Sequence, residues 1–354
     1  MGRNLQHTAV SPGYALQLQL ALVQFVRWVR IHKQINLYKQ RKPSVQMLNT
    51  YLVEYVQSLY ESKRSVAAAT HTVLAVQQKF PHANRQLQRA WTSVRSWKSE
   101  LAIALRPPLP HIYLQIYVTA ALVKGLFSDR RNAHVWLPFA ALLHVGFHGM
   151  MRPIELDHML RGHVVLPSSL LLQDAEQMII TVPHPKNRRF GGRVQHRLIK
   201  DKIAIQWLSW LCADLSPQAK VFPFTRATMR ILFKDLNQQL QLQACHFAPS
   251  SLRPGGATHL YLLGVPIDVI KFRGGWTALN SLEHYIQEAV AVRCLSAVSG
   301  SHETALKAIY DLFPSGALPP PLHWSRYFVR PQSVHKSELL QRKSQPLQQP
   351  KHMC

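Results

Sequence analysis

The sequence is poor in acidic residues, in cysteine and in long apolar runs, and each shortage narrows what the protein can be. Only 17 Asp and Glu residues stand against 42 Lys and Arg among 354 residues, which gives a formal net charge of +25. An excess of this size predicts a polyanionic partner, and nucleic acid is the usual one. Charge alone leaves a second interpretation open, a helical scaffold or membrane-surface protein whose basic face meets anionic lipid.

The four cysteines are scattered along the chain and show no paired spacing: Cys212, Cys245, Cys294 and Cys354. This pattern argues against a disulfide framework or a zinc module and favours a reducing compartment. No stretch approaches the roughly 20 apolar residues that a membrane span needs. We therefore expect a soluble protein of the nucleus or the nucleoid, with no membrane partner.

Prolines mark the strongest domain boundary. The segment Arg106-Pro107-Pro108-Leu109-Pro110 contains three prolines that cannot continue a helix. We expect an N-terminal arm over residues 1–14, a helical DNA-binding domain over 15–105, a linker over 106–111 and a second domain over 112–300. Residues 301–354 are expected to form a C-terminal helix and a basic disordered tail, because residues 314–354 contain seven prolines and only one acid.

Hydrophobic spacing predicts that the first domain is mainly helical. Leu48, Leu52 and Val56 recur every four residues, so they form one apolar helix face behind an N-cap at Ser44. Further helices are predicted over 65–78 and 84–101.

The helix predicted over 84–101 is strongly basic. Its four cations are Arg85, Arg89, Arg95 and Lys98. One interpretation is a solvated helix face with Trp91 and Trp97 packed inward. The other is a helix that lies against DNA phosphates, and the sequence leaves both open.

The second domain combines many predicted helices with a small patch of strand. Residues 178–182 are rich in β-branched side chains, residues 194–199 fit as a hairpin partner, and residues 163–166 fit as a third strand. Helices are predicted near 202–214, 225–240, 251–263, 266–273 and 279–298.

Residues suited to breaking a DNA strand without a metal follow one another through this domain. That chemistry needs a nucleophile such as tyrosine, arginine forks on the phosphate and an acid for the departing oxygen. The segments, in order, are His148-Gly149-Met150-Met151-Arg152-Pro153-Ile154-Glu155-Leu156, Pro185-Lys186-Asn187, Ser250-Ser251-Leu252-Arg253-Pro254-Gly255-Gly256-Ala257-Thr258, Arg273-Gly274-Gly275-Trp276 and His284-Tyr285-Ile286.

This series resembles the tyrosine recombinase, or phage integrase, family over residues 140 to 290, and is most similar to recombinase-like proteins of eukaryotic mobile elements. The family has an Arg followed by Glu-Leu, a β-hairpin Lys, a His-x-x-Arg box, a Gly-His or Gly-Trp, and a Tyr about nine residues later. The resemblance implies a mainly α fold of two domains, a helical core-binding domain and a mostly α catalytic domain with a small β-sheet.

The resemblance also implies a role for each matching residue. Arg152 and Arg253 would clamp the scissile phosphate, while Glu155 would hold Arg152 or its helix in place. Lys186 would protonate the leaving 5′ oxygen. Arg188, Arg189 and Arg193 lie in the same loop and are expected to bind DNA, and the sequence leaves open that any of these four cations contacts backbone phosphates only. Trp276 would offer its indole N–H to the phosphate. Tyr285 would attack, although Leu282 and Ile286 beside it also fit a tyrosine buried in a helix.

The family comparison further implies strand transfer through a 3′-phosphotyrosyl link, with no metal or cofactor. Recombinases of this kind act as tetramers on paired sites in duplex DNA. The apolar side of the helix predicted over His302–Leu312 is a candidate surface for docking onto a neighbouring protomer.

Ser250 departs from the family pattern because it stands where the His of the His-x-x-Arg box is expected. Serine can donate a hydrogen bond to a phosphate oxygen, but it cannot accept a proton at neutral pH as imidazole can. His246 would replace the imidazole only if the segment bends back. The alternative to an active enzyme is therefore a catalytically impaired, DNA-binding relic of a mobile-element recombinase.

His144 and His148 have the four-residue spacing of metal ligands on a helix. The sequence shows no Glu or other third ligand near them, so we expect packed or surface histidines and no metal.

Overall fold

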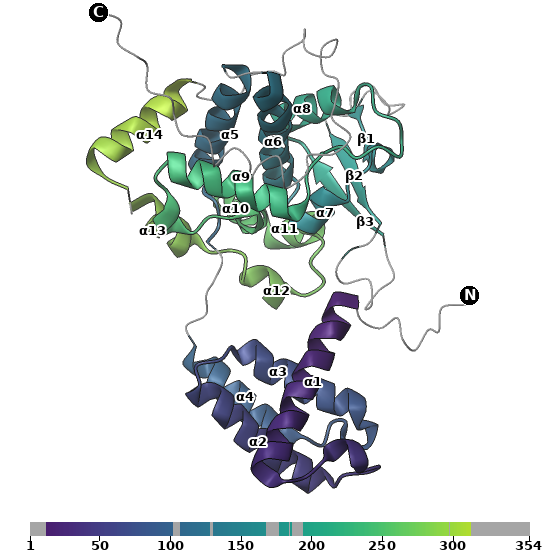
Figure 1. Ribbon diagram of the computed structural model, residues 1–354. Coiled ribbons are helices and arrows are strands. Elements are labelled where there is room, and N and C mark those ends of the chain that lie inside the picture. Colours follow the sequence, from purple (N-terminus) through teal and green to yellow (C-terminus); the bar gives the residue numbers. More distant parts are fainter. Residues whose placement is uncertain are drawn as a thin grey trace, which may run out of the picture. The chain divides into compact units, whose positions relative to one another are not determined.

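A computed structural model describes residues 12–101, 107–127, 130–167, 177–183, 185, 194–296 and 298–312. The chain divides into two compact units, Met1–Ala104 and Leu105–Cys354, shown in purple to blue and in blue to yellow in Figure 1. Within the described ranges, no helix is long and apolar enough to cross a bilayer.

The first unit is a bundle of four helices, α1 (Pro12–Lys33), α2 (Val45–Glu61), α3 (Val66–Lys79) and α4 (Gln88–Glu100). The predicted cap of α2 is confirmed, since the Ser44 hydroxyl accepts a hydrogen bond from the Met47 amide at 3.2 Å. Leu48, Leu52 and Val56 are buried in the bundle core, as their spacing predicts.

Helix α4 begins at Gln88, four residues later than predicted, because a side chain from α2 caps it. The buried Asn49 accepts a hydrogen bond from the Ala90 amide at 3.3 Å and donates one to the Gln86 carbonyl at 3.0 Å. Arg85 therefore lies in the preceding turn, where its φ is +61°. Local sequence could not show this cap, because Asn49 is distant in the chain.

The second unit is built around α5 (His111–Leu126) and α6 (Arg130–His148), which pack side by side. Figure 1 shows the sheet on one side of this pair and the last two helices on the other. Short helix α7 (Pro153–Asp157) follows α6, and α8 (Lys202–Cys212) packs against α6.

The predicted three-stranded antiparallel sheet is confirmed. Strands β1 (Val164–Val165), β2 (Met178–Val182) and β3 (Gln195–Ile199) lie in the order β1-β2-β3. Ile180 of β2 pairs with Val164 on one side and with Arg197 on the other. The side chains of Met178, Ile180 and Val182 are buried, so this face of β2 closes the core of the unit.

The remaining helices follow α8 along the chain. They are α9 (Arg226–Gln239), α10 (Leu252–Leu262), α11 (Ile267–Gly274), α12 (Leu279–Glu283), α13 (Glu288–Ser296) and α14 (Gly300–Leu312). The apolar side of α14 packs within its own chain, since Leu306 is buried in the core and Ile309 lies against it. Only Leu312 of the predicted docking face is largely exposed, at 59%.

The prediction of one helix over 279–298 is wrong. The helix breaks between α12 and α13, where the Thr258 hydroxyl donates a hydrogen bond to the Tyr285 carbonyl at 3.1 Å and accepts one from the Gln287 amide at 3.2 Å. These bonds from α10 replace helical backbone bonds. Tyr285 therefore lies in a turn fixed by α10, and not within a helix.

Candidate active site

Three arginines gather around one buried carboxylate in the second unit. Glu155 lies 2.7 Å from Nη1 of Arg152 and 3.5 Å from Nη2 of Arg197, and one of its oxygens also accepts a hydrogen bond from the Arg152 amide at 2.9 Å. Arg152 precedes α7, Glu155 lies on α7 and Arg197 lies on β3. Glu155 thus joins the start of α7 to the sheet, which is the holding role implied for it.

Arg253 is the deeply buried member of the site. Only 2% of it is exposed, and it donates hydrogen bonds to the Met150 carbonyl at 2.5 Å and the Gly274 carbonyl at 2.9 Å. Its guanidinium carbon lies 3.9 Å from the centre of the Trp276 ring and 5.5 Å from that of Tyr285. The stacked, forked geometry suits arginine and does not suit lysine.

The charges of the arginines act on one another. Burial, followed by the repulsion of Arg152 and Arg197, lowers the pKa of Arg253 to about 9, so it stays charged at neutral pH. Burial opposes ionisation of Glu155, but Arg197 and Arg152 outweigh it and hold the pKa of Glu155 below its usual value. Three cations therefore face one anion, and two positive charges stay uncompensated within the cluster.

Several buried N–H groups of this cluster have no hydrogen-bond partner among the described residues. They are Nε of Arg197, Nε of Arg253 and Nε1 of Trp276. Buried donors are almost always paired in native proteins, and unpaired ones mark strain or a place for a ligand or water. Unpaired donors combined with excess positive charge are the features of a site for an anion such as phosphate.

The Gly274-Gly275 pair allows Trp276 to reach Arg253. Gly275 has a φ of +64°, and a Cβ atom at this position would collide with Nη1 of Arg197. A Cβ atom on Gly274 would collide with the Trp276 ring. Trp276 is 6% exposed and contacts the Tyr285 ring edge-on at 5.3 Å between centroids. The structure thus brings together Arg152, Arg253, Trp276 and Tyr285.

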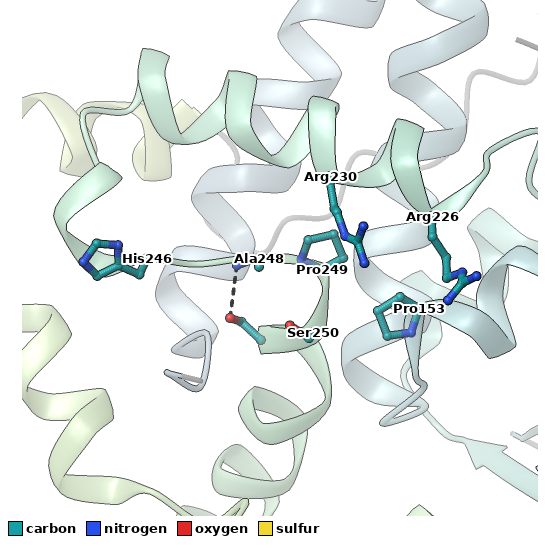
Figure 2. Close-up of a pocket in the computed structure, with 8 residues that line it drawn as sticks. Pro153, Arg226, Arg230, His246, Ala248, Pro249 and Ser250 are labelled. Carbon is teal, nitrogen blue, oxygen red and sulfur yellow. Dashed lines mark hydrogen bonds between the residues drawn. The ribbon is translucent and has the colours of Figure 1, made fainter. Parts of the chain in front are cut away.

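Ser250 precedes Arg253 by three residues and lines a separate open pocket of about 310 Å³. Figure 2 shows Arg230 extending from α9 toward Pro249 and Arg226 toward Pro153, with His246 on the opposite side. The dashed line marks the bond from the Ala248 amide to the Ser251 hydroxyl, at 3.1 Å. His246, with a φ of +53°, does line the same pocket as Ser250, because the backbone turns there.

The predicted phosphate contacts are only partly within the described residues. Lys186, Arg188, Arg189 and Arg193 lie outside them, between β2 and β3. In the first unit, Arg85, Arg89, Arg95 and Lys98 are all exposed. Trp97 is buried and Trp91 packs against the core, so the inward side of α4 is as predicted.

Arg197 was missed in the sequence, although the strand pattern contained a clue. In β3 the side chains of Arg197 and Ile199 point to the same buried face, as alternation requires. A cation at an inward position of a strand needs a partner. Arg226 and Arg230, which line the Ser250 pocket, carried no comparable clue, because a helix surface rich in arginine is ordinary.

The structure brings a third possible ligand to His144 and His148, which the sequence around them does not show. Asp201 is the N-cap of α8, and its carboxylate lies close to both imidazoles. One possible ligand atom from each of the three side chains lies within 4.8 Å of the other two. Nε2 of His148 is 3.7 Å from Oδ2 of Asp201. The sequence does not reveal this contact, because Asp201 comes after the three strands and is far from both histidines in the chain.

The architecture is that of the tyrosine recombinases. The XerH site-specific recombinase bound to palindromic difH substrate, a post-cleavage complex, matches with a TM-score of 0.50 and 16% identity, over 80% of this chain and 78% of that chain. The XerH pre-cleavage complex matches with a TM-score of 0.49 and 16% identity, over 77% of this chain and 76% of that chain. The Tn1549 transposon integrase in complex with circular intermediate DNA matches with a TM-score of 0.45 and 12% identity, over 86% of this chain and 95% of that chain.

No protein-family profile and no curated sequence matches the chain. At 16% identity the likeness to the post-cleavage XerH complex establishes the fold alone. The closer resemblance to recombinase-like proteins of eukaryotic mobile elements stays a prediction.

Proposed function

We propose that this protein is a DNA strand transferase of the tyrosine recombinase kind, which cuts and rejoins duplex DNA through a 3′-phosphotyrosyl intermediate. One observation carries the proposal. Beside the Tyr285 ring, a buried cluster holds two uncompensated positive charges and unpaired N–H donors on Arg197, Arg253 and Trp276. Such a site can bind a phosphodiester and stabilise the extra negative charge of its transition state.

In the proposed reaction the Tyr285 oxygen attacks phosphorus and the bond from phosphorus to the 5′ oxygen breaks. The leaving oxygen takes a proton from Lys186, and the phenolic proton passes to solvent, because Ser250 cannot accept it. Arg152 and Arg253 hold the nonbridging oxygens, and the Trp276 indole N–H donates to one of them. A second 5′ hydroxyl then attacks the phosphotyrosyl link and gives its proton to Lys186. The bond from phosphorus to the Tyr285 oxygen breaks, that oxygen takes a proton from solvent, and the strand is rejoined.

Binding to duplex DNA is proposed to rest on phosphate contacts from both units. The exposed cations Arg85, Arg89, Arg95 and Lys98 would contribute from the first unit. Arg188, Arg189 and Arg193, between β2 and β3, would contribute from the second. The pairing of two DNA sites would require a homo-oligomer, a tetramer by analogy, acting in the nucleus or a nucleoid.

Trapping of a covalent adduct tests this function. A pool of random-sequence duplexes, each nicked on one strand, loses the short leaving strand after cleavage and so prevents rejoining. We expect a protein–DNA adduct that resists denaturation with wild-type protein and disappears with Tyr285→Phe. An adduct that persists in the Tyr285→Phe variant would contradict the proposal.

A second function, DNA binding without cleavage, is favoured by Ser250. The position that would carry an imidazole carries a hydroxyl that lines an open pocket. A relic of this kind would bind duplex DNA in a salt-dependent manner and form no adduct. Restoration of adduct formation by Ser250→His would identify the wild-type chain as such a relic.

A further inference from the structure

The histidines at the end of α6 lie in a polar cluster outside the proposed active site. His144 and His148 are one helical turn apart, and Asp201 caps the start of α8 next to them. The rings of His111 and His259 stack on each other at 4.2 Å, and both pack against the His148 ring, at 6.0 Å and 6.5 Å. The proposed strand transfer uses none of these residues.

We propose that His144, His148 and Asp201 form a site for one divalent transition-metal ion of the zinc class. Two imidazoles and one carboxylate are a common ligand set for such ions, and two histidines four apart on a helix present their nitrogens to the same point. A tetrahedral zinc ion requires ligand atoms about 3.4 Å apart. The pair His148 Nε2 and Asp201 Oδ2, at 3.7 Å, is already near that separation.

The surroundings orient the ligands. Oδ1 of Asp201 accepts a hydrogen bond from the Ala204 amide at 2.7 Å, which leaves Oδ2 facing His148. A ligand carboxylate held by a backbone donor in this way is typical of metal sites. The side chains of His148 and Asp201 are 16% and 27% exposed, while His144 is 2% exposed. An ion can therefore arrive from solvent, and a water molecule can complete its coordination.

The position of the site suggests its role. His148 precedes Arg152 by four residues, and Asp201 follows Arg197 by the same number. An ion bound there would tie the end of α6 to the start of α8, and so brace the two segments that carry these arginines. The ion would stabilise the second unit and would take no part in bond breaking, so this inference does not depend on strand transfer.

Metal titration of the full chain tests the proposal. Protein stripped with a chelator is titrated with Zn²⁺ and with Co²⁺, whose visible absorption reports coordination. We expect one ion per chain and a Tm increase of about 5 °C or more at saturating Zn²⁺. The absence of binding to the wild-type chain would overturn the proposal.

Variants locate the site. Asp201→Asn is the sharpest, because the amide oxygen still caps α8 but is a poor zinc ligand. We expect it, and His148→Ala, to weaken Zn²⁺ binding at least about tenfold. His158→Ala, which removes an exposed histidine of the same unit, should leave binding unchanged. Equal Zn²⁺ affinity in the wild-type, Asp201→Asn and His148→Ala proteins would also overturn the proposal.

Discussion

The buried arginine cluster and the open Ser250 pocket come close in the chain at Arg253 and Ser250, which are three residues apart, yet the surrounding structure fixes these two side chains to different degrees. Arg253 is held by two carbonyls and a tryptophan ring, against the repulsion of two other arginines. Ser250 is half-buried in a pocket whose other charged side chains, Arg226 and Arg230, extend from a helix surface. The cluster proposed to bind phosphate is thus fixed by the core, whereas the position where the family resemblance implies a histidine lies in an open pocket.

The largest effect is expected when the carboxylate at the centre of the cluster is removed. Glu155→Ala leaves Arg152 and Arg197 without their anion, and a broken buried pair of this kind costs about 3–5 kcal/mol of unfolding free energy. Urea unfolding followed by tryptophan fluorescence measures the loss. A cost below about 1 kcal/mol, the value of an exposed pair, would show that the cluster is solvated.

Arg253→Lys should reduce covalent adduct formation about 10²–10³-fold, the usual cost of losing a donor to the transition state. Lysine keeps the charge but cannot bond both carbonyls while it stacks on Trp276. The matched control is Arg230→Lys in the open pocket, for which we expect less than about a tenfold change. Equal losses in the two variants would remove the distinction between the two regions.

Ser250→His should raise the rate of adduct formation about 10²-fold, because an imidazole can take the phenolic proton. The pocket has space for the larger ring, at about 310 Å³. Ser250→Ala serves as the control and should show no gain. Single-turnover kinetics on nicked duplexes measures both, and an unchanged rate in Ser250→His would mean that proton removal does not limit the reaction.

The pH dependence of stability should also come from the arginine cluster. The pKa of Glu155 is lowered in the folded protein, so its contribution is complete above its ordinary pKa of 4.5 and is lost as the pH falls through the lower, folded value. Urea midpoints measured from about pH 6 down to about pH 3 should fall more steeply for wild-type protein than for Glu155→Gln. If the urea midpoints of the two proteins fell equally with pH, the assignment of this pH dependence to Glu155 would be contradicted.

The smallest effects are expected at the exposed cations of the first unit. Arg89→Ala or Lys98→Ala should each reduce the salt dependence of duplex binding by about one unit of slope and the affinity by a few fold. Lys33→Ala is the control and should leave the slope unchanged, because Lys33 is already paired with Glu54, with 2.5 Å between Nζ and Oε2. Fluorescence anisotropy at several salt concentrations makes the measurement, and an unchanged slope would favour a merely solvated helix face.

Local sequence patterns predicted most of the helices and strands, and they revealed the residues that resemble the family motif. These features depend on residues close together in the chain or on strong alternation; they include the cap at Ser44, the strands of the sheet and the segment around Arg253. The arrangement of Arg152, Trp276 and Tyr285 in one place followed only from the family resemblance, because spacing alone places no residue in space.

The failures share a physical cause, which is a side chain arriving from a distant element. Asn49 of α2 shortens α4, and Thr258 of α10 divides the helix predicted around Tyr285. Arg197 of β3 pairs with Glu155 of α7, and Asp201 reaches His148 from the start of α8. Each contact is a hydrogen bond or ion pair that appears only after folding, so periodicity and propensity carry no record of it.

The most direct test of the account is to identify the residue that carries the DNA. Trypsin releases Tyr285 in the peptide from Gly274 to Arg293, which contains no other tyrosine. After trapping on nicked duplex DNA and nuclease digestion, mass spectrometry should find a nucleotide linked through phosphate to Tyr285. A nucleotide attached to any other residue, or an unmodified peptide from protein that binds the same DNA, would contradict the assignment of Tyr285 as the nucleophile.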